Sequence, residues 1–335
     1  QVQAIDVADV AALSTSQVNA LSTIQVNALT TVQVAGLTTT QLSNLADAKL
    51  QAVSTSGVAA LTSDQVMSLT TGQVAVVTTA QLQALTTGNV AALTTTQVQA
   101  LGGSQVAALT TSAVVALTTD QVAAFTTTQV PSITTAQVQA LKADQVTALT
   151  TAQVTKLDTN QVTAITNANV AALSTAQVNA LSTTQLTSLG TSQVQSLTAA
   201  VVAALTTDKL TALTTTQVKA LTADQIGALT TTEAAAITTT QVKVLGADQI
   251  RALSTASVAA LTTTQLQALT DAQVSGLTNN TVSSFTTTQV AGLATGQVQL
   301  LADSVVTGLS TTQLTSLTTS QVGALTASQV RSLST

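Results

Sequence analysis

The sequence predicts an all-α fold, an α-solenoid of about 42 very short helices with one helix for each eight-residue repeat. Three observations support this prediction. An octad with the consensus Q-V-x-A-L-T-T-x runs through the chain without a change of phase. Each octad carries helix-starting residues at the spacing of a capping box. The acidic residues all lie at or near the expected helix starts, where the helix dipole favours negative charge.

The octad is regular from one end of the sequence to the other. Steps of eight from Gln1 to Gln329 give 42 positions, of which 30 are Gln. The next position is Val, Leu or Ile in 41 of the 42 octads, and Ala234 is the exception. The Leu position is always large and apolar, and Phe125 and Phe285 both occupy it. Because repeat arrays usually tolerate insertions in surface loops, this regularity indicates that no free loop joins consecutive units.

Residues 21–29 show why the octad favours a helix. Ser22 is a good N-cap residue and Gln25 follows three residues later, which is the pattern of a capping box. Leu21 and Val26 are placed to form a hydrophobic staple. At 100° per residue, the Gln, Val, Ala and Leu of the octad fall within one arc of roughly 160°. A β-solenoid is the alternative, since Thr and Val favour strands, but alternation would put Val and Leu on opposite faces.

The cap position supports the helical interpretation, because it is Ser, Thr, Asp or Gly in 38 of 42 octads. The four departures are Ala46, Lys142, Ala294 and Ala302. All thirteen acids lie at caps or in the first three helical positions, and five of the eight bases lie in the second half of the helix. The bases outside that half are Lys49, Lys142 and Lys209. Pro131 falls at a fifth helical position, where it removes a backbone donor, so we expect one weakened turn there.

Helices this short are unstable in isolation, so their Val and Leu faces must be covered by neighbouring helices. We therefore expect a core of stacked Val and Leu, flanked by small residues that let backbones approach closely. These are mostly Ala, with several Ser and with Gly36, Gly276, Gly292 and Gly308. The repeated Gln has two possible roles: it can bond back to its own cap or reach a carbonyl of a neighbouring helix. The pattern fixes neither this choice nor the number of helices in one turn of the coil.

The domain organisation follows from the same regularity. No linker or charge run divides the chain, and the single Gly pair, Gly102-Gly103, leaves the count intact. We expect one continuous array over residues 1–335. Neither end has the polar outer face of a terminal capping repeat, so we expect a segment of a longer array, or a unit that continues end to end with copies of itself.

The composition argues against an enzyme. The chain has no His, Cys, Trp or Tyr, and only 6% of its residues are charged. Ser and Thr hydroxyls lack a neighbouring base, and the acids are scattered singly rather than clustered as metal ligands. Glu233 stands where the capping-box Gln is expected and can accept the same bond. The sequence therefore predicts no catalytic, cofactor-binding or metal site.

Charge and hydropathy also limit the partners. A net charge of −5 without a basic cluster argues against nucleic acid. Every apolar run is interrupted within a few residues, so we expect no insertion into a membrane. The predicted partners are other copies of the chain, end to end or side by side, and a cell-surface or matrix component.

The unbroken LTTxQVxAL tract resembles the octapeptide regions of very large bacterial surface or secreted proteins, such as adhesins, surface-layer proteins and filament-forming proteins. This resemblance implies an exported protein at the bacterial cell surface or outside the cell. It also implies that the repeats serve as a stalk, a fibre or a coat.

Three functions are compatible with these observations. The first is a structural scaffold, because the octad uses every position for a cap, the core or the solvated surface. The second is a protein- or glycan-binding module of an adhesin, although binding grooves usually cluster aromatic or Arg anchors. The third is an ice-binding array of Thr, which Ala, Asn, Asp and Gly interrupt here.

Overall fold

The computed structural model describes residues 1–333, and these residues form α-helices and two short 3₁₀-helices without a strand. The all-α prediction is confirmed, and the alternative of a β-solenoid is wrong. The chain divides into two compact units, Gln1–Ala172 and Leu173–Thr335, which we call unit 1 and unit 2.

Each unit is a succession of helices of four to seven residues and, in unit 1, two 3₁₀-helices of three residues. Unit 1 contains η1 (Val2–Ala4), α1 (Val7–Ala12), α2 (Thr15–Ala20), α3 (Thr23–Asn27), α4 (Thr31–Gly36), α5 (Thr39–Ser43), α6 (Asp47–Ala52), α7 (Thr55–Ala59), α8 (Ser63–Ser68), α9 (Thr71–Val76), α10 (Thr79–Ala84), α11 (Thr87–Ala92), α12 (Thr95–Ala100), α13 (Gly103–Ala108), α14 (Thr111–Ala116), α15 (Thr119–Ala124), η2 (Val130–Ser132), α16 (Thr135–Ala140), α17 (Ala143–Ala148), α18 (Thr151–Val154), α19 (Thr159–Ala164) and α20 (Asn167–Ala172). Unit 2 contains α21 (Thr175–Ala180), α22 (Thr183–Ser188), α23 (Thr191–Ser196), α24 (Ala199–Val202), α25 (Thr207–Ala212), α26 (Thr215–Ala220), α27 (Ala223–Gly227), α28 (Thr231–Ala236), α29 (Thr239–Val242), α30 (Ala247–Ala252), α31 (Thr255–Ala260), α32 (Thr263–Gln267), α33 (Asp271–Ser275), α34 (Asn279–Ser283), α35 (Thr287–Gly292), α36 (Thr295–Leu300), α37 (Asp303–Thr307), α38 (Thr311–Thr315), α39 (Thr319–Ala324) and α40 (Ala327–Leu333).

Helix α4 shows how an octad starts and stops. The backbone N–H of Gln33 donates to Thr30 Oγ1 at 3.2 Å, and the N–H of Thr30 donates to Gln33 Oε1 at 2.9 Å, which is the predicted capping box. The helix ends at Leu37, whose backbone is extended, and Thr38 is extended as well before the next helix begins. Two extended residues thus join consecutive helices, and the expectation that no free loop separates them is confirmed.

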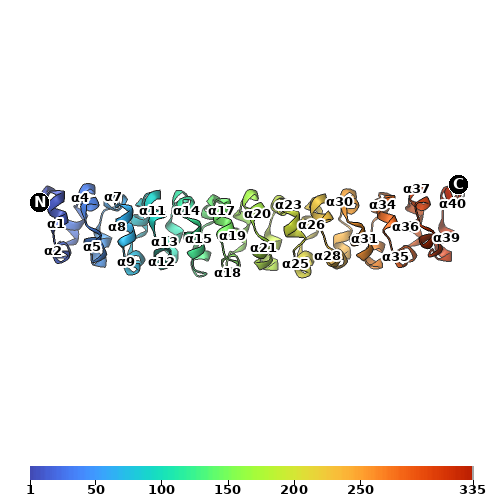
Figure 1. Ribbon diagram of the computed structural model, residues 1–335, viewed down its shortest axis with the longest axis horizontal. Helices are drawn as coiled ribbons and strands as arrows, with labels where there is room; N and C mark the ends of the chain where they lie inside the picture. The colour runs from blue at the N-terminus through green and yellow to red at the C-terminus, as the bar shows by residue number, and fades with distance from the viewer. Residues whose placement is uncertain (334–335) are drawn as a thin grey trace. The chain divides into compact units, whose positions relative to one another are not determined.

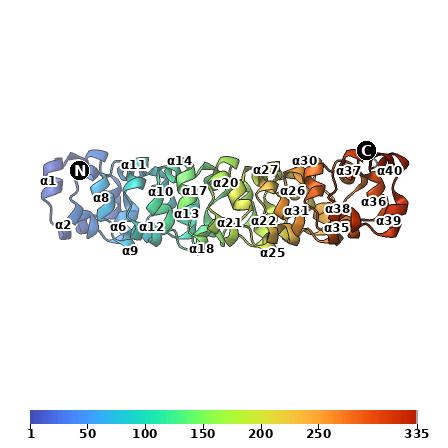
Figure 2. The ribbon, with the colours of Figure 1, turned by 45° about the vertical axis from the view of Figure 1, so that its right-hand side comes forward.

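The two kinds of contact between turns define how the coil winds. Helices pack against the helix three places along the chain, as α1 does on α4 and α4 on α7. Hydrogen bonds from the repeated Gln span 28 to 31 residues, as from Gln33 to the carbonyls of Ile5 and Val2, which reaches back almost four octads. One turn therefore contains between three and four helices. In unit 1, α4, α7, α11, α14, α17 and α20 lie along the upper edge in Figure 1, and the steps between them alternate between three and four places when η2 is counted. Figure 2 shows α11 and α14 on the same edge of unit 1 after the rotation.

The core of each unit is the predicted stack of Val and Leu. Val34, Val98 and Leu186 have no measurable exposure, and most of their counterparts are almost as well buried, whereas Val322 and Val330 in the last described turn of unit 2 are each 52% exposed. Burying one such side chain contributes about 1.5–3 kcal/mol, which offsets the instability of a single short helix. Phe125 and Phe285 are also buried at their Leu positions, so they are packing residues as predicted.

The predicted irregularities are found where the sequence places them. At Pro131 the α-helix is replaced by the 3₁₀-helix η2, because proline has no N–H to give to the carbonyl four residues earlier. Glycines do allow close approach: a Cβ on Gly36 would clash with Val7 Cγ1, and one on Gly292 would lie 2.7 Å from Thr263 Cγ2. The acids cap the helices or lie in their first turns.

Candidate functional site

The most regular chemical feature of each unit is a row of buried Gln side chains, which we call the glutamine ladder. Gln41 is one rung and is only 2% exposed. Its Oε1 accepts the N–H of its own cap residue, Thr38, at 2.8 Å. Its Nε2 donates to the carbonyl oxygens of Val10 at 2.9 Å and Leu13 at 2.6 Å in the preceding turn. One amide therefore closes its own helix start and the end of a helix one turn away.

The two roles that the sequence left open are thus both filled by the same side chain. A primary amide has one acceptor oxygen and two donor hydrogens, and this is what the rung requires. The C-terminal carbonyls of a short helix lack partners within the helix, and the rung supplies one. Within residues 1–333 every buried side-chain nitrogen and oxygen has a hydrogen-bond partner, as native interiors require.

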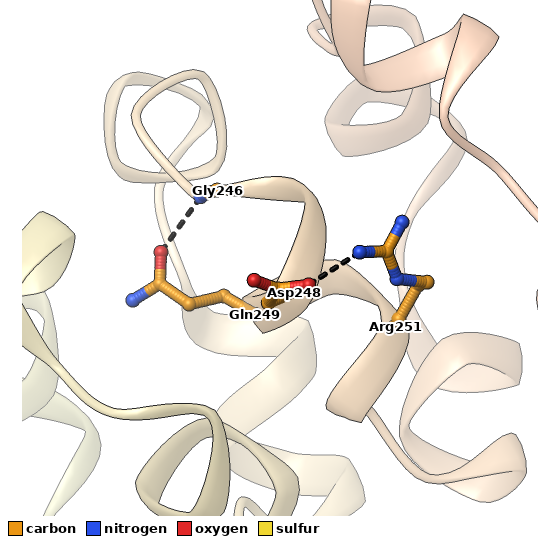
Figure 3. A network of polar contacts seen from close by, with 4 residues as sticks. All are labelled: Gly246, Asp248, Gln249 and Arg251. Carbon is orange, nitrogen blue, oxygen red and sulfur yellow. Dashed lines mark hydrogen bonds and ion pairs between the residues drawn. The ribbon is translucent and has the colours of Figure 1, made fainter.

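Figure 3 shows one rung and an ion pair on the same helix. The N–H of Gly246 donates to Gln249 Oε1 at 2.7 Å, and the amide nitrogen of Gln249 points away from Gly246. That nitrogen donates to Val218 and Leu221 in the preceding turn. Asp248 and Arg251 are paired on the same helix, three residues apart, and both are solvent-exposed. The pair contributes little because water screens it.

Five of the residues that replace Gln keep the donor role. Asn89, Asn169 and Ser257 each donate to the Leu carbonyl 28 residues earlier, at 2.7–2.8 Å. Lys49 and Lys209 do the same with their ammonium groups, to the carbonyls of Leu21 and Leu181. The position of these two lysines, which runs against the dipole rule, is therefore explained by the ladder.

A lysine on the ladder cannot accept the N–H of its cap residue, and a second side chain replaces that bond. The N–H of Ala46, the cap residue of the Lys49 helix, donates to Asn19 Oδ1 at 2.8 Å. Thr206 is the cap residue of the Lys209 helix, and its N–H donates to Asn179 Oδ1 at 3.2 Å. Both Asn residues lie in the preceding turn, and sequence reasoning missed this pairing because the length of a turn was unknown.

An open hollow lies on the outer surface of unit 1, and we call it the Lys142 hollow. It encloses about 570 Å³ and is open to solvent. Its lining consists of Thr87, Thr111, Ser112, Val115, Ala116, Ala140 and Lys142. The sequence marked Lys142 as a poor cap residue and as a base outside the second half of its helix, and it did not indicate that Lys142 lines a hollow. Hydroxyls, methyl groups and one ammonium can contact a ligand here, but this lining contains no acid, base or nucleophile pair.

Among the described residues no three His, Cys, Asp or Glu side chains lie close enough to hold a metal ion. The remaining cavities are small and lined mainly by Val and Leu, such as one of about 20 Å³ beside Phe285. No helix between residues 1 and 333 is both long and apolar enough to cross a bilayer.

Comparison with known proteins identifies the repeat. A family model described as the ALTTAQ repeat matches seven stretches that together cover well over half of the sequence: 2–39, 74–111, 104–135, 114–151, 162–199, 201–231 and 245–279. The chain belongs to the ALTTAQ repeat family. No protein among those with curated descriptions matches the chain.

The ALTTAQ motif has a direct structural meaning, which residues 148–153 illustrate because they spell it in full. Ala148 ends helix α17, Leu149 is buried in the core and Thr150 caps α18. Thr151 and the next residue form the first turn, and Gln153 is the ladder rung, with Nε2 at 2.9 Å from the carbonyl of Val122. The ALTTAQ motif is thus the junction between two helices together with the residue that binds this junction to the preceding turn.

Proposed function

We propose that the chain is a structural scaffold, a segment of a stalk, fibre or coat that holds a fixed shape. The observation that supports this most is the glutamine ladder. In the ordinary octads of each unit the buried polar side chain is used to join one turn to the next, as Gln121 does with Val90 and Leu93 at 2.9 and 2.6 Å. The remaining positions form caps, core or solvated surface, so none is set apart for a reaction.

The resemblance to octapeptide regions of bacterial surface proteins supports a place outside the cell. We propose an extracellular or cell-surface location, no enzymatic activity, and self-association of the arrays either end to end or side by side. The exposed faces carry mainly Thr, Ser and Ala with few charges, and weakly charged surfaces of this kind offer little electrostatic repulsion between copies.

Electron microscopy and small-angle X-ray scattering of the purified 335-residue chain test the scaffold role. We expect particles of uniform width whose cross-section is that of one coil, together with filaments or sheets at high protein concentration. An expanded chain without a defined cross-section would contradict the proposal, because a scaffold has to hold its shape.

A second candidate is a binding module for a protein or a glycan, and the Lys142 hollow is the observation that favours it. A glycan array and a pull-down with bacterial surface extracts would separate the two functions. Saturable binding that is lost in Lys142→Ala but retained in Lys156→Ala would favour the module. Lys156 is a suitable control because it is another lysine of unit 1 and does not line the hollow.

A further inference from the structure

Two acids, Asp9 and Glu233, occupy the Gln position of the octad. Only Glu233 follows a complete turn of the coil, so only Glu233 has carbonyls of a preceding turn to face. It is only 4% exposed. Its Oε2 accepts the N–H of Thr230 at 2.7 Å and the Thr230 hydroxyl at 3.0 Å, so the carboxylate does the capping job that the sequence predicted. An ionised carboxylate has no hydrogen to donate, however. Glu233 therefore cannot donate to the carbonyls of the preceding turn as a Gln rung does.

The neighbouring rungs show which atoms this leaves without their usual donor. Gln225 Nε2 donates to the carbonyls 31 and 28 residues earlier at 2.9 and 2.6 Å, and Gln241 does the same at 2.9 Å for both. The same register places the carbonyl oxygens of Val202 and Leu205 opposite Glu233. Val202 and Leu205 are buried, at 0% and 4% exposure, and the Leu205 N–H donates to the Val202 carbonyl as in an ordinary octad.

Two other octads show that a cation fits beside these carbonyls. The ammonium groups of Lys49 and Lys209 occupy the rung position and donate to the carbonyls of Leu21 and Leu181. The rung site therefore accepts a full positive charge, held by the partial negative charge of the carbonyls at a helix end. At Glu233 the side chain adds a full negative charge to the same kind of site.

We propose that Glu233 and the carbonyl oxygens of Val202 and Leu205 bind a monovalent cation of the size of K⁺ or NH₄⁺. Its positive charge balances the single carboxylate, and it takes the place that the Gln amide or the Lys ammonium fills elsewhere. Glu233 Oε1 accepts no hydrogen bond from the described residues, and because every fully buried side-chain oxygen there has a partner, this oxygen keeps some access to solvent and is available as a ligand. Ca²⁺ is disfavoured because its sites usually contain several carboxylates, whereas this site contains one.

The test is hydrogen exchange of the purified chain, measured by mass spectrometry in KCl, NH₄Cl and tetramethylammonium chloride at equal ionic strength. Tetramethylammonium is too large for the site and serves as the inert cation. We expect exchange in peptides covering 199–205 and 230–236 to slow in KCl or NH₄Cl. At a concentration ten times the dissociation constant, the equilibrium for local opening shifts about elevenfold. Equal exchange in all three salts would overturn the proposal.

Three variants provide the controls. Glu233→Gln restores an ordinary rung, and Glu233→Lys supplies an ammonium donor as Lys209 does, although Ala203 stands where Lys209 has its helper Asn179. Neither variant needs a bound cation, so in each of them exchange is expected to be the same in all three salts. Gln241→Glu creates the same ligand set one octad later, with the carbonyls of Leu210 and Leu213, and is expected to acquire the cation response in its own peptides. A response that persists in Glu233→Gln, or one that fails to appear in Gln241→Glu, would contradict the assignment.

Discussion

Removal of one rung is the sharpest test of the ladder, and Gln121→Ala in unit 1 is the variant we would make. Gln121 is 2% exposed and its side chain makes four hydrogen bonds. Its Oε1 accepts the Thr118 N–H at 2.8 Å, and its Nε2 donates to the carbonyls of Val90 and Leu93 at 2.9 and 2.6 Å. The longer contact with the Ala91 carbonyl, at 3.2 Å, is secondary.

The expected cost follows from the groups that lose their partner. The Val90 carbonyl keeps a bond from the Leu93 N–H, so the groups affected most are the Thr118 N–H and the Leu93 carbonyl. Leaving a buried polar group unsatisfied costs about 1–3 kcal/mol, and two such groups give about 2–6 kcal/mol before any water enters. Gln121→Asn is the matched control. It keeps the donor role, as Asn89 does with Leu61 at 2.8 Å, and is expected to lose about half as much.

Hydrogen exchange is the suitable assay, because a repeat array unfolds locally and a single melting temperature is not well defined for it. Peptides covering 90–93 and 118–124 are expected to exchange faster in Gln121→Ala, while peptides of unit 2 stay unchanged. If the loss of local stability in Gln121→Ala were below about 0.5 kcal/mol, the usual size of a neutral surface change, the ladder would not hold the turns together.

Three further substitutions test close packing and the Pro131 irregularity. A Cβ on Gly227 would lie 2.9 Å from the Ala252 carbonyl oxygen, so Gly227→Ala is expected to destabilise unit 2 by about 1–3 kcal/mol, whereas Gly296→Ala meets nothing within 4 Å and is expected to stabilise it by about 0.5–1 kcal/mol. Equal effects in chemical denaturation would contradict this reasoning. Pro131→Ala is expected to convert η2 to an α-helix and to stabilise unit 1 by up to about 3 kcal/mol. Unchanged helicity by circular dichroism together with unchanged stability would refute that expectation.

Local structure could be predicted from the sequence because the information is local. The capping box joins residues three apart, as Ser22 and Gln25 do, and both of its hydrogen bonds are present, at 3.2 and 2.7 Å. The apolar arc of the octad likewise needs only the geometry of one helix. The acids obey the dipole rule for the same reason, since each responds to the start of its own helix.

The winding of the coil could not be predicted, because it depends on contacts between octads that are nearly identical. An octad that repeats without a longer period gives no signal that distinguishes a neighbour three octads away from one four octads away. The octads in which Lys replaces Gln do indicate the length of a turn. Asn19 and Asn179 each precede such a lysine by the same interval, slightly less than four octads. That spacing becomes meaningful only after the structure shows that the Asn replaces a missing acceptor.

The ladder also explains why the octad tolerates no insertion. Each rung residue bonds to a carbonyl almost four octads earlier. A residue added between Leu61 and Thr62 therefore lengthens the chain between donor and acceptor in four rungs at once. These are the rungs of Gln65, Gln73, Gln81 and Asn89. A single residue that is not accommodated as a bulge shifts every one of them out of register, whereas a complete added octad offers each rung an equivalent carbonyl from the next helix.

We therefore expect one inserted Gly at this junction to destabilise unit 1 more than an inserted complete octad of the consensus sequence, TTTQVAAL. Four displaced rungs at about 1 kcal/mol or more each exceed the cost of closing a longer connection, which is about 0.6 kcal/mol for a doubling of length. Chemical denaturation and hydrogen exchange of the two variants measure the difference. Equal stability would mean that the two extended residues between helices absorb the extra residue, and the uninterrupted octad would then need a cause other than the ladder.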